Sequence, residues 1–362
     1  MLRSEKGYRG KSLALDILAR IESEMAGSPP VNLMEVCGTH TVSIGRLGLR
    51  RAMPANLRLL SGPGCPVCVT PGGYIDAAAA LALGGVTVAT FGDMVRVPGD
   101  KTSLEEARAR GGRVVVTASV NGALDIARAE PGEVAFLAVG FETTAPTIAA
   151  AVIAAEREQL ANFSVLVSQK LVPPALRLIL DDAECAVSGF ILPGHVSTVI
   201  GTAPYEFIAA EFGVPGVIAG FELVDVLAAI ESLVRMVRTD EASVQNAYTR
   251  AVRADGNPTA RGIAAKVFEP VDTAWRGIGR IPASGLALRK EYAAFDAALR
   301  YRIGVEDSAL PEGCACGDVL RGLIRPTGCP LFGGRCRPQS PVGPCMVSIE
   351  GACAVSYKYG EE

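Results

Sequence analysis

Short runs of β-branched and other apolar residues alternate along the chain with longer amphipathic or alanine-rich stretches. This alternation predicts parallel β-sheets with helices on both faces, because each strand of such a sheet is followed by a crossover of a dozen or more residues. The eight runs that we predict as strands are Val31–Val36, Leu57–Leu60, Val86–Thr90, Val114–Thr117, Val134–Val139, Phe163–Val167, Gly189–Leu192 and Val217–Ala219. The helices predicted between them include Tyr74–Leu83, Ser103–Arg110, Thr143–Leu160 and Pro173–Leu180.

The fold class that follows is α/β, with two similar parallel-sheet domains facing a cleft and a mainly helical or irregular third domain. The simplest partition gives four consecutive strands to each sheet, in residues 29–132 and residues 133–239. Residues 240–362 form the third domain, which we expect to be an iron-sulfur domain for the reasons given below. Residues 1–28 hold an amphipathic helix, about Lys11 to Met25, whose apolar face is expected to pack on another domain.

The third domain carries the weakest pattern of the chain. Helices are predicted at Glu241–Arg253 and Arg289–Tyr301, with a loop around Ile281–Gly285 between them. Trp275 and Tyr292 are interpreted as packing residues rather than ligand contacts.

Composition narrows the class of protein. The chain has 362 residues, of which 49% are hydrophobic and 20% charged, and a net charge of -3. Such a chain is typical of a well-packed globular protein and has no excess of positive charge for nucleic acid or anionic lipid. The apolar runs are too short to cross a bilayer, so we expect a cytoplasmic protein without membrane association. Ten cysteines in a cytoplasmic chain point to metal binding or thiol chemistry.

Reactive side chains follow the carboxyl ends of the predicted strands, where open α/β sheets bind their ligands. They include Cys37, Cys65, Asp93, Glu142 and His195. Loops are polar in any protein, which explains each of these residues singly. So many reactive types in the same position favour a site at this rim.

Cys37 precedes a segment with helical pattern, so its sulfur is expected near a helix N-terminus. The amide groups and dipole there favour a thiolate and lower a pKa of about 8.5 to roughly 3.5–7.5. A thiolate could bind a soft metal or attack an electrophile. The alternative is a buried cysteine that behaves as a small hydrophobe. His40, three residues later, is by itself more often a cap or core residue than a ligand.

Cys65 and Cys68 form a C-x-x-C pair after a Pro-Gly turn. This spacing lets two sulfurs close a small disulfide or share a metal. No second pair at similar spacing exists to complete a zinc ribbon, so a reversible dithiol is favoured over a metal half-site. Cys185 has no partner nearby in sequence and is interpreted as structural.

Six cysteines lie among many Gly and Pro residues near the C-terminus. Four of them, Cys314, Cys329, Cys336 and Cys353, have the spacing C-x14-C-x6-C-x16-C, too irregular for a zinc ribbon and suited to an iron-sulfur cluster. Cys316 and Cys345 are the other two, and chemistry alone neither selects four ligands from six nor excludes zinc. A cluster would supply the folding energy that this segment lacks, and beside a C-x-x-C dithiol it suggests one-electron input to a two-electron thiol couple.

Several motifs, in order and over nearly the whole chain, resemble the HypD family of [NiFe]-hydrogenase maturation proteins. They are Met34–Thr41 (MEVCGTHT), Gly62–Cys68 (GPGCPVC), Phe91–Pro98 (FGDMVRVP), Gly140–Pro146 (GFETTAP), Leu192–Ser197 (LPGHVS) and Gly343–Ser348 (GPCMVS). The spacing of the four cysteines matches the family as well.

The resemblance implies a scaffold on which the iron of the hydrogenase active site receives two cyanide ligands and one carbon monoxide. A small HypC-type chaperone would bind the iron jointly with this chain, a HypE-type partner would deliver cyanide, and the hydrogenase large subunit would be served indirectly. Cys37 would be the iron ligand, with Thr39 and His40 close to it. Cys314, Cys329, Cys336 and Cys353 would hold a [4Fe-4S] cluster, and Cys65 with Cys68 would pass electrons toward the iron.

Less is implied for the remaining motif residues. Asp93, Glu142 and His195 are interpreted as donors of protons or hydrogen bonds to the cyanide, whose transfer develops charge. Two other function classes remain open: a [4Fe-4S]-dependent thiol-disulfide reductase of a protein substrate, for which Cys37 would be dispensable, and a structural module in which the cluster only orders the C-terminal segment. The fold class by itself does not distinguish the scaffold from these two alternatives.

Overall fold

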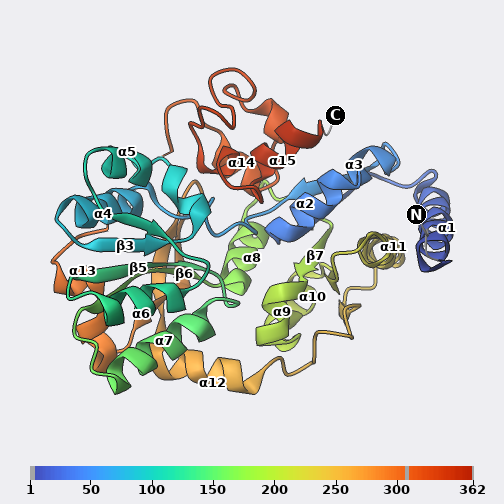
Figure 1. Cartoon of the computed structure of the whole chain (residues 1–362). Coiled ribbons are helices and arrows are strands. Elements are labelled where there is room, and N and C mark those ends of the chain that lie inside the picture. The colour runs from blue at the N-terminus through green and yellow to red at the C-terminus, as the bar shows by residue number, and fades with distance from the viewer. Residues whose placement is uncertain (1–4, 306–309, 361–362) are drawn as a thin grey trace.

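The computed structural model describes residues 5–305 and 310–360 and contains two β-sheets (Figure 1). The first, sheet A, is parallel throughout, with the strand order β2-β1-β7-β8-β9. Its strands are β1 (Val31–Glu35), β2 (Leu57–Ser61), β7 (Gly189–Pro193), β8 (Gly216–Ala219) and β9 (Val244–Asn246).

The second, sheet B, is mixed and has the order β10-β11-β6-β5-β3-β4. Four strands are parallel, and the hairpin of β10 and β11 adds an antiparallel edge beside β6. Its strands are β3 (Thr87–Thr90), β4 (Val114–Val116), β5 (Val134–Gly140), β6 (Phe163–Lys170), β10 (Phe268–Trp275) and β11 (Gly279–Leu288). All seven residues of β5 are buried, as expected of a central strand that is covered on both faces.

Helices cover both sheets and connect their parallel strands. The α-helices are α1 (Glu5–Met25), α2 (Gly38–Arg46), α3 (Leu49–Ala52), α4 (Gly72–Leu83), α5 (Leu104–Ala109), α6 (Val120–Ala129), α7 (Ala145–Arg157), α8 (Val172–Asp181), α9 (Gly194–Ile200), α10 (Glu206–Phe212), α11 (Leu223–Thr239), α12 (Pro258–Val267), α13 (Ala297–Arg300), α14 (Cys316–Leu320) and α15 (Ala352–Tyr359). Five 3-10 turns add η1 (Gly92–Arg96), η2 (Ala203–Tyr205), η3 (Lys290–Phe295), η4 (Pro326–Gly328) and η5 (Pro344–Met346). No helix in the described ranges is both long and apolar enough to span a bilayer.

The predicted α/β class and all eight predicted strands are confirmed, but the partition into consecutive groups of four is wrong. β1 pairs with β7, more than 150 residues later in the chain, so each sheet takes strands from both of the ranges expected for the two α/β domains. The C-terminal range also contributes, with β9 in sheet A and β10 and β11 in sheet B. That the two halves face one another across a cleft stays a prediction.

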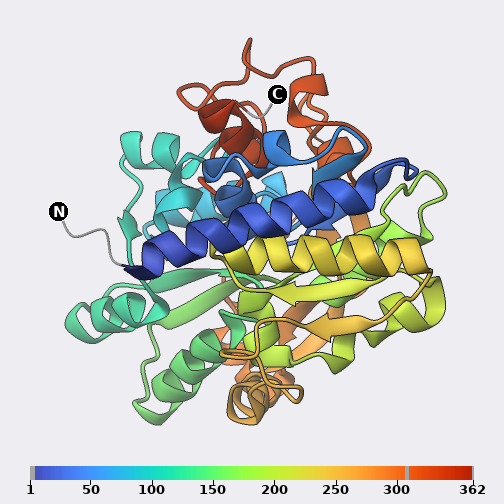
Figure 2. The same ribbon diagram turned by 90° about the vertical axis from the view of Figure 1, so that its right-hand side faces the viewer.

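Helix α1 lies along α11 on one face of sheet A, and both run side by side across the molecule (Figure 2). Ile17 and Ile21 of α1 are buried in a cluster with Ile230 and Leu233 of α11. The ion pair of Arg20 with Glu231 borders this contact. The apolar face of the amphipathic N-terminal helix therefore packs against α11.

Two predictions for the C-terminal range are wrong. Residues expected in a helix at Glu241–Arg253 contain strand β9, because pairing with β8 extends the edge of sheet A. The loop expected at Ile281–Gly285 lies within strand β11. The range Arg289–Tyr301 holds the short η3 and α13 in place of one helix. Trp275 is buried as predicted, and its indole nitrogen donates to Ser284 Oγ at 2.9 Å.

The segment with six cysteines packs over α2, with α14 and α15 the helices that it contains (Figure 1). A buried cluster joins it to the carboxyl ends of both sheets, with Val36 directly after β1, Phe141 directly after β5 and Leu192 in β7. The fold thus brings the cysteine groups of the two chain ends to one region.

Candidate functional site

Cys37 stands where strand β1 ends and helix α2 begins, as the sequence predicts. Its sulfur receives hydrogen bonds from the backbone amides of His40 and Thr39, which favour a thiolate. Burial acts in the opposite direction and is the larger effect, so the pKa of the Cys37 thiol is raised to about 12. The expected lowering of this pKa is therefore wrong: the side chain is only 8% exposed, and the carboxylates of Glu350 and Glu35 oppose a second negative charge.

His40 is fully buried in α2, and its imidazole Nε2 lies 2.9 Å from the carbonyl oxygen of Gly220. Burial lowers the pKa of His40 to about 4, so the ring is neutral. A carbonyl only accepts hydrogen bonds, so Nε2 carries the proton and Nδ1 is a hydrogen-bond acceptor. Among the described residues, Nδ1 has no hydrogen-bond partner.

Phe221 joins the two histidines of the chain. Its ring stacks on His195 with 4.1 Å between centroids and lies tilted against His40 at 4.6 Å. His195 stands in the first turn of α9, after strand β7, and its side chain is exposed. The two histidines that the sequence placed on different strands therefore belong to one site, and Phe221 is a member that sequence reasoning missed.

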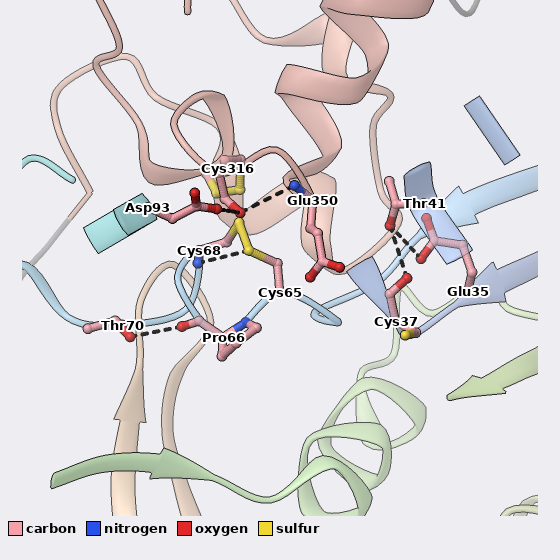
Figure 3. Close-up of a disulfide and its surroundings, with 12 residues drawn as sticks. Glu35, Cys37, Thr41, Cys65, Pro66, Cys68, Thr70, Asp93, Cys316 and Glu350 are labelled. Atoms are coloured by element: carbon pink, nitrogen blue, oxygen red, sulfur yellow. Dashed lines mark hydrogen bonds between the residues drawn. A yellow bond between two sulfur atoms is a disulfide. The ribbon is translucent and has the colours of Figure 1, made fainter. Parts of the chain in front are cut away.

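The C-x-x-C segment lies against the backbone of Cys37. Cys65 and Cys68 form a disulfide between β2 and α4, and both are buried (Figure 3). The amide of Gly38 donates to the carbonyl of Gly64 at 2.8 Å. A Cβ on Gly64 would lie 2.2 Å from the Cys37 nitrogen, so glycine is required for this approach.

The C-terminal segment supplies carboxylate and hydroxyl groups to the same region (Figure 3). Glu350 Oε1 accepts a hydrogen bond of 2.8 Å from the hydroxyl of Thr39. Asp93, in η1 after strand β3, accepts at Oδ2 from Ser348 Oγ at 3.0 Å. Glu350 was missed by sequence reasoning, although it stands two residues after the motif that ends at Ser348.

Glu142 follows strand β5 and is 6% exposed. Its Oε1 accepts from the amide of Val172 at 2.9 Å, whereas Oε2 is buried with no partner among the described residues. Burial raises the pKa of Glu142 to about 7. Tyr205, fully buried nearby, has its pKa raised by burial and by the charges of Glu142 and Cys37, so electrostatic contact extends across this interior.

All six C-terminal cysteines line one cavity, together with Leu331, Phe332 and Met346. Cys316 and Cys345 form a disulfide, a pairing that the sequence left open. Cys316 and Cys68 belong to one buried cluster, and Figure 3 shows both in the surroundings of the Cys65–Cys68 disulfide. The remaining four, Cys314, Cys329, Cys336 and Cys353, are free.

Cys314, Cys329, Cys336 and Cys353 line one cavity as free thiols, the donor type that holds a [4Fe-4S] cluster. Among the described residues, no three His, Cys, Asp or Glu side chains are placed to hold one metal ion, whose thiolate ligands would converge at about 2.3 Å. A [4Fe-4S] cluster is wider and takes four separated thiolates. Two features of the cavity accommodate the cysteine sulfurs. Gly343 leaves room for Cys314, because a Cβ there would lie 2.7 Å from Cys314 Sγ, and the amide of Val342 donates to Cys336 Sγ at 3.3 Å. The pKa of Cys353 is raised by burial and by repulsion from the other three, which bound iron would relieve.

The fold and the site together define an α/β protein that gathers a buried thiol, two disulfides and four free cysteines around the ends of two sheets. The family model described as "HypD: Hydrogenase formation hypA family" matches residues 12–360. The chain therefore belongs to the HypD family of hydrogenase maturation factors.

Curated relatives are similar in sequence to this chain over nearly their whole length. The hydrogenase maturation factor HypD2 of Bradyrhizobium diazoefficiens is 45% identical, covering 98% of this chain and 96% of that protein. The hydrogenase maturation factor HypD of Rhizobium leguminosarum bv. viciae is 46% identical over 98% of this chain and 94% of its own. The hydrogenase maturation factor HypD of Cupriavidus necator is 44% identical, covering 98% of this chain and 96% of that protein.

Proposed function

We propose that this chain is a cytoplasmic scaffold on which the Fe(CN)2CO group of [NiFe]-hydrogenase is assembled. Cys37 would bind the iron jointly with a HypC-type chaperone, and a HypE-type partner would supply the cyanide. The finished group would pass through the chaperone to the hydrogenase large subunit. The observation that carries the proposal is that both disulfides and the four free cysteines join one buried cluster, and that the loop before Cys65 lies against the backbone of Cys37.

The surroundings of Cys37 suit a ligand that changes state when its metal cargo arrives. Without a metal, burial keeps the thiol protonated. Iron would displace that proton, because a coordinating thiol is deprotonated outright. The amides of Thr39 and His40 would then orient the thiolate, the proton would leave to solvent, and the neutral His40 Nδ1 would be free to accept a hydrogen bond.

Carboxyl and imidazole groups from four elements would handle charge during cyanide transfer. Glu142, with its pKa raised to about 7, can be a proton donor near neutral pH. His195 would donate a hydrogen bond to the incoming group, and Asp93 and Glu350 would hold the hydroxyls of Ser348 and Thr39 in place around it. Of these, Glu350 is held beside Cys37 through Thr39.

The two disulfides suggest a thiol redox path toward the iron. A [4Fe-4S] cluster on Cys314, Cys329, Cys336 and Cys353 would supply electrons singly when bound. The chain's own step is thiol-disulfide exchange, in which the reduced pair Cys316 and Cys345 attacks the Cys65–Cys68 disulfide and becomes oxidised itself. Two electrons and two protons move from one pair to the other, leaving Cys65 and Cys68 as thiols next to Cys37.

Infrared absorption in the cyanide and carbonyl stretching region tests the scaffold. Chain co-produced with its HypC-type chaperone and purified without oxygen is expected to show both kinds of band. Cys37→Ala should remove them, while Cys185→Ala, a substitution at a half-buried cysteine outside the site, should keep them. Bands that persist in Cys37→Ala would reject Cys37 as the iron ligand.

The neighbouring disulfides also favour a second candidate, a [4Fe-4S]-dependent thiol-disulfide reductase of a protein substrate. Its activity would need Cys65 and Cys68 but not Cys37. A Cys37→Ala chain that still supports hydrogenase maturation in a strain lacking the wild-type protein would favour this reductase over the scaffold.

A further inference from the structure

An arginine-lined pocket lies on the outer edge of sheet A, where strand β2 meets the C-terminal segment. Arg50, Arg51 and Arg58 line one side and Arg325 the other. The hydroxyls of Ser61, Thr327 and Ser356 also line it, and no carboxylate of residues 5–305 or 310–360 does. The cavity measures about 100 Å³, which is the liquid volume of roughly three waters and suits a small anion rather than a peptide.

A buried carboxylate offsets part of the positive charge of these arginines. Arg50 donates to Glu35 at 3.3 Å and to Ser61 Oγ at 2.8 Å, so the buried Glu35 offsets one guanidinium. Arg58 and Arg325 are exposed, and within residues 5–305 and 310–360 neither makes an ion pair or a side-chain hydrogen bond. Both guanidinium groups line one pocket whose described lining has no carboxylate, so they repel one another, and an anion would relieve that repulsion.

We propose that this pocket binds a phosphate-bearing small anion. Guanidinium groups present a planar fork of donors that matches phosphate oxygens in two-point hydrogen bonds, which explains arginine on both walls. The hydroxyls add neutral donors between them. A carboxylate has two oxygens and would bind only one guanidinium group in this two-point manner. A phosphoryl group has enough oxygens to bind two guanidinium groups at once.

The place of the pocket gives such an anion a structural effect. Thr327 stands two residues before Cys329, Ser356 three residues after Cys353, and Ser61 four residues before Cys65. An anion bound by Arg58 and Arg325 would therefore tie strand β2 to the segment of free cysteines. Phosphate binding should raise the midpoint of thermal unfolding of the whole chain, because it stabilises only the folded state.

Calorimetric titration of the full chain at low ionic strength tests the site, with inorganic phosphate, inorganic pyrophosphate and ADP as separate probes. We expect saturable binding of one anion per chain. Arg58→Gln and Arg325→Gln should each weaken it about tenfold or more, since a charge-assisted hydrogen bond contributes at that level. Arg108→Gln, at an exposed arginine on α5 outside the pocket, is the matched control and should leave the affinity unchanged.

The three probes identify the source of the anion. Equal affinity for ADP and pyrophosphate would assign recognition to the phosphates, and tighter binding of ADP would assign a nucleotide. Absence of saturable binding by all three probes would overturn the proposal. So would an equal loss in Arg108→Gln and Arg58→Gln, because that result describes non-specific surface charge. Thermal unfolding without ligand confirms that each variant is folded.

Discussion

The hydroxyl of Thr39 donates a 2.8 Å hydrogen bond to the carboxylate of Glu350, which stands 311 residues later in the chain. Thr39 lies in the first turn of α2, whose start carries Cys37, and Glu350 immediately precedes the turn into α15. This contact attaches the segment with six cysteines directly beside the Cys37 thiol. It also fixes the carboxylate that raises the pKa of that thiol.

We expect Thr39→Val and Glu350→Ala to lower the free energy of unfolding non-additively. A hydrogen bond to a charged group contributes about 1.5–3 kcal/mol, and the partner left behind is only partly hydrated. A double-mutant cycle in denaturant should therefore give a coupling energy of about 1 kcal/mol or more. Additive losses in the double variant would show that the contact does not hold the segment in solution.

Gly64→Ala should destabilise the chain strongly. The new Cβ would lie 2.2 Å from the Cys37 nitrogen and 2.4 Å from the Val36 carbonyl carbon, and backbone atoms cannot rotate away. Overpacking of this kind costs about 3 kcal/mol, equivalent to a fall of roughly 4 °C in Tm for a chain of this length. Gly132→Ala is the matched control, because its Cβ would meet no atom within 4 Å. Similar Tm values for both variants would contradict the close approach of the two loops.

Local patterns predicted the elements but not their assembly. The run Val134–Val139 is apolar throughout, as a strand buried on both faces must be, and it is recognisable without any knowledge of its neighbours. The pairing of β1 with β7 depends on long-range contacts that leave no periodic signal in either strand. Strand β9 was predicted as a helix for the same reason, since its conformation is decided by β8.

The sequence likewise predicted only part of the candidate site. Cys37, Cys65 and His195 could be found because strand ends in α/β proteins collect ligand-binding residues. The raised pKa of Cys37 could not be predicted, because the two amides that lower it are local, whereas the burial that raises it depends on tertiary contacts such as the approach of Gly64. The Cys316–Cys345 pairing depends equally on tertiary structure.

Removing the Cys316–Cys345 disulfide should prevent reduction of the Cys65–Cys68 disulfide. With dithionite as reductant under anaerobic conditions, the wild-type chain is expected to show new thiols at Cys65 and Cys68, measured by alkylation and peptide mass spectrometry. In Cys316→Ala with Cys345→Ala these two residues should stay oxidised, because direct access from solvent to the buried pair is poor. Cys185→Ala should behave as wild type. Unchanged reduction of Cys65 and Cys68 in the double variant would remove the Cys316–Cys345 pair from the proposed path.

Glu142 should make the stability of the chain depend on pH near neutrality. Burial raises its pKa from 4.5 to about 7, so between these values the folded state holds a proton that the unfolded state has lost. The free energy of unfolding must therefore fall as pH rises through this window. A shift of this size corresponds to roughly 3 kcal/mol, all of which is lost above about pH 8.

Glu142→Gln removes that dependence, because the amide is neutral at every pH and keeps an oxygen for the amide of Val172. We expect Tm of the variant to match or lie below that of the wild type near pH 5 and to exceed it near pH 8. Glu206→Gln, at an exposed position on α10, should give the same Tm difference from wild type at both pH values. If the Tm difference for Glu142→Gln is equally constant, the Glu142 carboxyl is ionised in the folded chain and cannot donate a proton to an incoming cyanide.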